Sequence, residues 1–120
     1  MSASGPILVV DDDPGIRELI ELTLSDEGYE VITAANGAAA LEMVNRHPPA
    51  MILLDMRMPV MDGWEFAQSY RRNPGPHAPI VVVTAAQEAG ERAAQIQADG
   101  VLPKPFRLTE LLDAVEQFMP

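Results

Sequence analysis

Acidic side chains follow two apolar runs of the chain, at the point where each run ends. Asp55 comes directly after Met51–Leu54, and the three acids Asp11–Asp13 follow Ile7–Val10. Four consecutive large apolar residues are typical of a strand buried on both faces, as in a parallel sheet covered by helices. A lone carboxylate most often only terminates a strand, but two acid-bearing strand ends can converge at the ligand-binding edge of an α/β sheet. We therefore expect Asp55 to be presented at that edge rather than packed in the core.

Two later apolar runs end on polar residues of other kinds. Thr84 closes the run Ile80–Val83, and Lys104 lies just after the short run Gly100–Leu102. If the strands are parallel, three carboxylates, a hydroxyl and an ammonium surround one pocket. Crowded carboxylates repel one another and favour a hard divalent cation, and Mg²⁺ completes its oxygen shell readily with phosphate. A lysine and a hydroxyl can then hold the remaining phosphoryl oxygens.

The elements that would position these residues alternate along the chain. Apolar and β-branched runs predict five strands, at Ile7–Val10, Tyr29–Ala34, Met51–Leu54, Ile80–Thr84 and Gly100–Leu102. Helical periodicity predicts five helices, between Pro14 and Gly28, between Asn36 and Pro48, from Trp64 to Arg72, from Gln87 to Ala98, and from Leu108 to Met119. This alternation implies a parallel sheet with right-handed crossovers and helices on both faces.

Local signals mark the helix ends. Asp13 is a capping residue followed by proline at the first helical position, and Gly28 is suited to end that helix. Asn36 is interpreted as a second cap rather than as a hairpin turn, because no alternating apolar residues follow it.

Apolar stripes indicate which helix faces pack on the sheet. The first helix carries one stripe of residues at helical spacing: Ile16, Leu19, Ile20, Thr23 and Leu24. The last helix carries another: Leu108, Leu111, Leu112, Val115 and Met119. We assign the aromatic side of the third helix, which includes Trp64, to packing, because no basic groove accompanies it. The pattern from Gln87 to Ala98 has little besides Ile96 to bury, so we expect it to be weakly anchored.

Composition narrows the class of protein. A chain of 120 residues with 48% hydrophobic content predicts one domain over residues 1–120 with a real core. Eight basic residues against 18 acidic ones, a net charge of −10, argue against direct binding to nucleic acid. The chain has no cysteine, no basic-then-apolar leader pattern and no apolar run of about 20 residues. We therefore predict a cytoplasmic protein without membrane insertion.

Four motifs in this order and spacing resemble the receiver domain of response regulators in two-component signalling. They are Val10-Asp11-Asp12, Leu54-Asp55-Met56-Arg57-Met58-Pro59-Val60-Met61-Asp62-Gly63, Thr84-Ala85 and Lys104-Pro105-Phe106. The resemblance covers Ile7 to Met119. It implies a flavodoxin-like, doubly wound (βα)5 fold, with its five parallel strands in the order 2-1-3-4-5.

The resemblance also implies a role for each motif residue. Asp55 would accept a phosphoryl group from a sensor histidine kinase or a histidine phosphotransfer protein. Lys104 would pair with Asp55 and then with the phosphoryl group, to which Thr84 would also bond. The implied oxygen ligands of Mg²⁺ are the carboxylates of Asp12 and Asp55, Asp11 through water, and the backbone carbonyl of Arg57. Asp13 would only cap its helix, and the Lys104-Pro105 peptide would be cis.

Such a domain is a signalling switch rather than an enzyme, although it assists its own phosphorylation and dephosphorylation, and it can form homodimers when phosphorylated. This sequence departs from the family at Val101, where many members have an aromatic switch residue, and Arg57 is unusually long and cationic. Because Val101 has no ring to reorient, we expect the signal to displace the loop 84–86 and the helix Gln87–Ala98. The surface that this helix shares with the fifth strand and the last helix would then change.

Two other classes share parts of this pattern. A flavodoxin-like mononucleotide binder would have the same fold, but Asp11–Asp13 after the first strand would repel phosphate. A metal-dependent phosphatase with an aspartyl nucleophile would use similar chemistry, but it usually carries the nucleophile after the first strand and needs a cap over its substrate.

Overall fold

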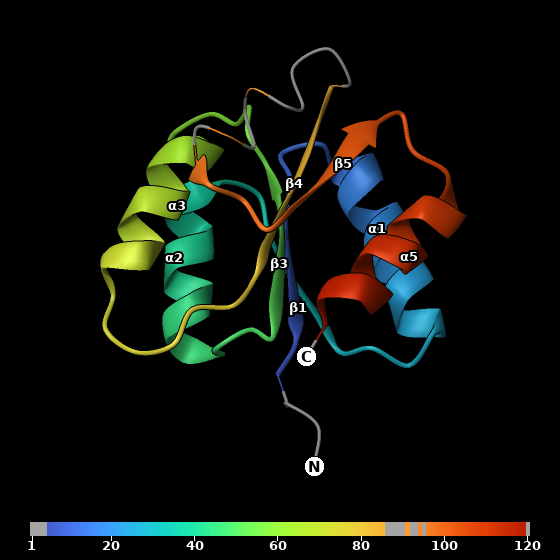
Figure 1. Ribbon diagram of the computed structural model, residues 1–120, viewed down its shortest axis with the longest axis horizontal. Coiled ribbons are helices and arrows are strands. Elements are labelled where there is room, and N and C mark those ends of the chain that lie inside the picture. Colours follow the sequence, from blue (N-terminus) through green and yellow to red (C-terminus); the bar gives the residue numbers. More distant parts are fainter. Residues whose placement is uncertain (1–4, 86–90, 92–93, 95, 120) are drawn as a thin grey trace.

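Five parallel strands form one sheet with helices on both of its faces (Figure 1). This arrangement comes from a computed structural model that describes residues 5–85, 91, 94 and 96–119. The strands are β1 (Ile7–Val10), β2 (Val31–Ala34), β3 (Met51–Asp55), β4 (Ile80–Ala85) and β5 (Gly100–Lys104). The helices are α1 (Pro14–Asp26), α2 (Gly37–Arg46), α3 (Gly63–Arg72) and α5 (Leu108–Phe118). The spatial order β2-β1-β3-β4-β5 confirms the predicted flavodoxin-like fold.

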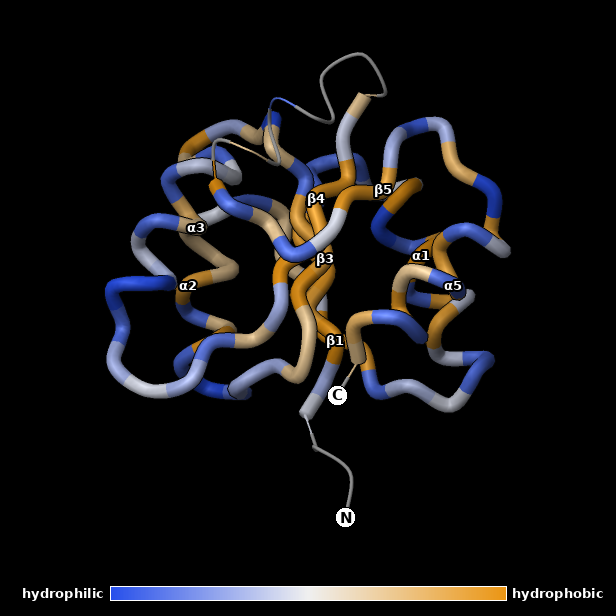
Figure 2. The backbone as a smooth tube through the Cα atoms, in the orientation of Figure 1, coloured by the Kyte–Doolittle hydropathy of each residue, from blue (hydrophilic) through white to orange (hydrophobic). Residues whose placement is uncertain are grey.

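The sheet divides the core into two layers. Helices α2 and α3 cover one face and α1 and α5 cover the other (Figure 1). Because successive strand residues point to opposite faces, Leu8 and Ile52 pack toward α2 and α3, whereas Ile7 and Met51 pack toward α1 and α5. The central strands are accordingly apolar along their whole length (Figure 2). This two-sided burial is the reason that β1 and β3 are continuous apolar runs.

Three helices begin at side-chain caps. The Asp13 carboxylate accepts hydrogen bonds from the amides of Gly15 (2.9 Å) and Ile16 (3.3 Å), which confirms it as the cap of α1. Asn36 accepts from the Ala39 amide at 2.9 Å, so its predicted capping role is confirmed as well. Asp62 caps α3 in the same way. Each cap satisfies an amide that has no partner within its helix, and so defines where the helix starts.

Four strands differ from their predicted bounds: β3 and β4 each end one residue later, and β2 and β5 differ by two residues. The second strand begins at Val31 rather than Tyr29, because the chain turns at Gly28, with φ of +91°, and the Tyr29 amide still bonds to the Leu24 carbonyl at 3.1 Å. The fifth strand continues through Pro103 to Lys104. A proline is tolerated there because β5 is an edge strand.

Some residues of the predicted apolar stripes lie at the surface. Trp64, the second residue of α3, is 41% exposed, and the stripe residues Leu19 and Leu108 are 45% and 44% exposed. Trp64 and Leu108 stand in the first turns of their helices, and Leu19 lies to one side of the buried line through Ile20 and Leu24. The prediction that Leu19 and Leu108 belong to the packed stripes was therefore wrong, whereas the exposure of Trp64 agrees with the predicted packing of the aromatic side of α3 in the core and at its edge. Most of the helix predicted from Gln87 to Ala98 lies outside the described residues. Ile96, which is described, is buried as predicted.

Candidate functional site

The ends of β1, β3, β4 and β5 bring the predicted site residues to one edge of the sheet. The parallel register aligns Val10 with Leu54, and Asp55 with Val83. It also places Lys104 beside Ala85, one residue after Thr84. Parallel strands have their carboxyl ends on the same side, so the acids, the hydroxyl and the ammonium meet there.

Three carboxylates converge at this edge. One carboxylate oxygen from each of Asp11, Asp12 and Asp55 lies within 4.8 Å of the others. Asp12 is exposed, whereas only 2% of Asp11 and 6% of Asp55 are accessible to solvent. The expectation that Asp55 is presented rather than packed was wrong in this respect, because Asp55 is still a paired residue of β3 and not part of the following loop.

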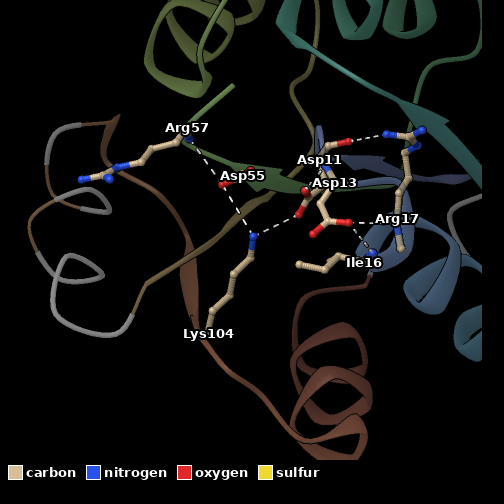
Figure 3. A network of polar contacts seen from close by, with 8 residues as sticks. Asp11, Asp13, Ile16, Arg17, Asp55, Arg57 and Lys104 are labelled. Atoms are coloured by element: carbon tan, nitrogen blue, oxygen red, sulfur yellow. Dashed lines mark hydrogen bonds and ion pairs between the residues drawn. The ribbon is translucent and has the colours of Figure 1, made fainter. Parts of the chain in front are cut away.

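Lys104 reaches two of these acids from β5. Its Nζ lies 3.2 Å from Asp11 Oδ2 and 3.9 Å from Asp55 Oδ1 (Figure 3). The ion pair with Asp55 that the family resemblance implies is therefore present, but the shorter contact is with Asp11. A single ammonium shared by two buried carboxylates leaves the cluster with an excess of negative charge.

The pKa of Asp55 reflects both its burial and its charged neighbours. Burial, and after it the neighbouring charge of Asp11, raise the pKa of Asp55 to about 6. Lys104 and the Arg57 amide, which donates to Asp55 Oδ1 at 3.3 Å, oppose the shift without cancelling it. The cluster is thus short of positive charge, and a hard divalent cation would supply it.

The β3–α3 loop, residues 56–62, follows Asp55 directly. The Arg57 side chain points away from the carboxylates in Figure 3 while its amide faces Asp55. Gly63 closes the loop, since a Cβ atom there would lie 2.6 Å from the Asp55 carbonyl oxygen. Only glycine allows that approach.

Within this loop Val60 has a left-handed backbone, with φ of 70°. The Met61 amide bonds to the Pro59 carbonyl at 2.8 Å across it, which makes a strained three-residue turn. The Met61 carbonyl in turn accepts from the Gly37 amide at 2.9 Å, so the loop also contacts the start of α2. Nothing in the sequence indicated the strain at Val60, since a valine carries no turn signal.

The remaining predicted residues lie where the motifs place them in the fold. Thr84 is buried at the end of β4, and the Lys104-Pro105 peptide is cis. Asp13 is engaged in capping α1 and is not part of the carboxylate cluster.

One residue of this network escaped the sequence analysis. Arg17, in the second turn of α1, donates through a guanidinium nitrogen to the Asp11 carbonyl at 2.7 Å (Figure 3). A long side chain that reaches back six positions to a backbone oxygen belongs to no recurrent motif, so nothing in the sequence distinguished Arg17 from a solvated helix residue.

The donor set suits Mg²⁺. Carboxylate oxygens are hard ligands, and three carboxylates share a single lysine at this edge. Arg57 would contribute its backbone carbonyl, an oxygen of the same kind. The residues present therefore fit a divalent cation such as Mg²⁺.

Comparison with known proteins agrees with this geometry. The family model described as the response regulator receiver domain matches residues 7–116. The chain is 44% identical over 115 residues to the response regulator MprA of Mycobacterium leprae, covering 94% of this chain and 50% of that protein. It therefore spans about half the length of the curated relatives it matches. Among the described residues, no helix is both long enough and apolar enough to cross a bilayer.

Solved structures give the same result for the fold. The chemotaxis response regulator CheY4 of Vibrio cholerae superimposes with a TM-score of 0.84 at 33% identity, covering 97% of this chain and 99% of that one. The receiver domain of NtrX from Brucella abortus gives a TM-score of 0.86 at 30% identity, covering 94% and 97%.

Fold and site together define a flavodoxin-like α/β domain with a cluster of three aspartates and a lysine at the carboxyl edge of its sheet. The chain belongs to the response regulator receiver domain family. It is thus a signalling domain of two-component systems, for which the general function is a phosphorylation-dependent switch and the general partner a histidine kinase or a phosphotransfer protein. Family membership decides against the mononucleotide-binding and phosphatase alternatives.

Proposed function

We propose that Asp55 accepts the phosphoryl group, that Mg²⁺ assists the transfer, and that the chain acts as one receiver domain over residues 1–120. The observation that supports this most strongly is the convergence of two further carboxylates, Asp11 and Asp12, and one lysine on the buried Asp55 at the end of β3. The three carboxylates carry more negative charge than Lys104 offsets. Their charges disfavour each other unless a cation joins them.

The transfer itself uses groups of this chain. A carboxylate oxygen of Asp55 attacks the phosphorus of a phosphohistidine; the new O–P bond forms as the P–N bond breaks, and the imidazole of the partner leaves. Asp12, Asp55 and the Arg57 carbonyl would hold Mg²⁺, with Asp11 holding it through water, and the ion would supply positive charge beside the carboxylates and the phosphoryl oxygens. Lys104 moves its ion pair from Asp55 to a phosphoryl oxygen, and Thr84 donates to another. Water later attacks the phosphorus of the aspartyl phosphate; the bond from phosphorus to the Asp55 oxygen breaks, inorganic phosphate leaves, and the switch is reset.

The acceptor is tested by mass. Treatment of the unchanged chain with a small phosphodonor and Mg²⁺ should add one phosphoryl group, and Asp55→Asn should abolish the addition, because the amide is not a nucleophile for phosphorus. Intact-mass spectrometry measures both. Asp13→Asn, which retains a capping side chain, is the matched control and should be modified normally. Stoichiometric modification of Asp55→Asn at another residue would overturn the assignment.

We propose further that the signal emerges on the surface of the segment 87–98, β5 and α5, where a partner or a second copy of the chain would bind. Phosphorylation adds about two negative charges beside Thr84 and Lys104. In the chain, Thr84 on β4 precedes the segment 87–98 and Lys104 on β5 follows it. Val101, 40% exposed on β5, has no aromatic rotamer to exchange. Hydrogen exchange with and without beryllofluoride should therefore change mainly between Thr84 and Lys104. Changes confined to Met56–Gly63 would mean that the domain signals through another face.

A further inference from the structure

Both the carboxylate and the backbone carbonyl of Asp11 are held by other residues. Its carboxylate accepts from the Asp13 amide at 2.9 Å and pairs with Lys104, while its backbone carbonyl accepts from Arg17 at 2.7 Å. Asp11 is almost completely buried, so its carbonyl needs a partner within the protein. The Arg17 guanidinium supplies one through a charge-assisted hydrogen bond, the stronger kind.

This carbonyl belongs to the peptide group that joins Asp11 to Asp12. A peptide group is planar, so the bond from Arg17 restricts rotation of the whole unit and with it the direction in which the Asp12 side chain leaves the backbone. The Asp12 carboxylate forms no hydrogen bond or ion pair with any described residue, and it is exposed. Its place in the cluster therefore depends on the backbone that Arg17 holds.

We propose that Arg17 is a positioning residue of the cation site, acting on Asp12 through the Asp11–Asp12 peptide. The inference rests on the proposed function, in which Asp12 is a metal ligand. It assigns to Arg17 a role that its charge alone would not predict. A cation near a Mg²⁺ site repels the metal, so by charge alone removal of Arg17 would strengthen metal binding. If Arg17 instead positions Asp12, its removal weakens metal binding.

The opposite signs make the inference testable with two variants of the full chain. Arg17→Met removes both the charge and the donor while it keeps an unbranched side chain, and Arg17→Lys keeps the charge and one donor. Arg72→Met removes one positive charge from the exposed last turn of α3, about 15 Å along the helix from its end at the site, and is the matched control. Isothermal titration calorimetry with MgCl2 measures the affinity of each, and thermal unfolding without metal measures stability.

We expect Arg17→Met to raise the Kd for Mg²⁺ about tenfold, the lower end of the range for residues that orient metal ligands. Arg17→Lys should recover most of the affinity, and Arg72→Met should leave it unchanged. Tighter binding by Arg17→Met would show that its charge dominates, and a lower unfolding temperature with unchanged affinity would show a purely structural role; either result overturns the inference. If the unchanged chain itself fails to bind Mg²⁺, the proposed function fails first, and the inference with it.

Discussion

The loops after β1 and β3 both bring aspartates to the site, but they are built in opposite ways. In the β1–α1 loop, residues 11–13, no residue has a positive φ; the carboxylate and the carbonyl of Asp11 both accept hydrogen bonds, and Asp13 caps the helix that follows. In the β3–α3 loop the chain passes through a left-handed valine, Val60, which is 82% exposed. The β1–α1 loop is held by hydrogen bonds, whereas the β3–α3 loop has a strained backbone at Val60.

The difference has a physical consequence for a switch. A cation site needs ligands in a fixed arrangement, and the β1–α1 loop meets that need with short hydrogen bonds. Asp55, the proposed acceptor, lies instead just before a segment whose conformation costs free energy and whose Met61 carbonyl contacts α2. In the proposed function, the hydrogen-bonded β1–α1 loop would hold the metal ligands in place, and the strained loop after β3 would respond when Asp55 is modified.

The largest expected effect tests whether, in the β1–α1 loop, Asp12 binds the metal while Asp13 only caps α1. Asp12→Ala should weaken Mg²⁺ binding by at least about tenfold, because a direct ligand is lost. Asp13→Ala should affect the metal much less but lower the free energy of unfolding by about 1 kcal/mol, because two amides of α1 lose their acceptor. Calorimetry and urea unfolding of both variants measure the two effects. Equal metal affinities would refute the division.

The next effect concerns Asp55, at the end of β3, and how its pKa changes the free energy of unfolding. The pKa of Asp55 in the folded chain is about 6, whereas a free aspartate titrates near about 3.9. As the pH rises between these values, the unfolded chain loses its proton first, so the free energy of unfolding falls from about pH 4 and has lost the whole contribution of this residue above about pH 6. Without metal, Asp55→Asn should therefore be more stable than the unchanged chain at pH 7.5, by on the order of 2 kcal/mol.

That gain should shrink toward pH 4, where the native carboxyl is protonated too. In millimolar Mg²⁺ the order should reverse, since only the unchanged chain then gains from binding the cation. Urea unfolding at pH 4.5 and 7.5, with EDTA or with Mg²⁺, provides the measurement. A gain that grows toward low pH would contradict the assigned direction of the pKa shift.

The smallest effect tests the backbone strain directly. Val60→Gly should raise the free energy of unfolding by about 1 kcal/mol, because glycine accepts a positive φ that an L-residue adopts only at a cost of roughly 1–2 kcal/mol, while its extra freedom when unfolded offsets part of the gain. Val60→Ala is the matched control; it removes exposed methyl groups but keeps Cβ, so it should change little. Equal stabilities of the glycine and alanine variants would argue that the loop is not strained.

Much of this comparison could be anticipated from the chain alone. The continuous apolar runs predicted two-sided strands, and acids, threonine and lysine at their ends predicted one shared edge, because parallel strands can place their carboxyl ends nowhere else. The caps Asp13 and Asn36 were predictable from the sequence as well, because a capping side chain bonds to amides within three residues of its own position. Local rules of this kind need no knowledge of the rest of the molecule.

Other features depend on contacts between distant segments, and only the tertiary structure decided them. The burial of Asp55 arises from its pairing with Val83 on β4. The shorter contact of Lys104 with Asp11 than with Asp55 joins residues from different strands, and the strain at Val60 arises where its loop closes onto Gly63 and α2. Residue types and spacing determined which groups meet, because strand direction and side-chain period are local properties of the chain. How far each group is buried, charged or strained was decided by the neighbours that folding brings to it, because desolvation and Coulomb interactions act through space and not along the sequence.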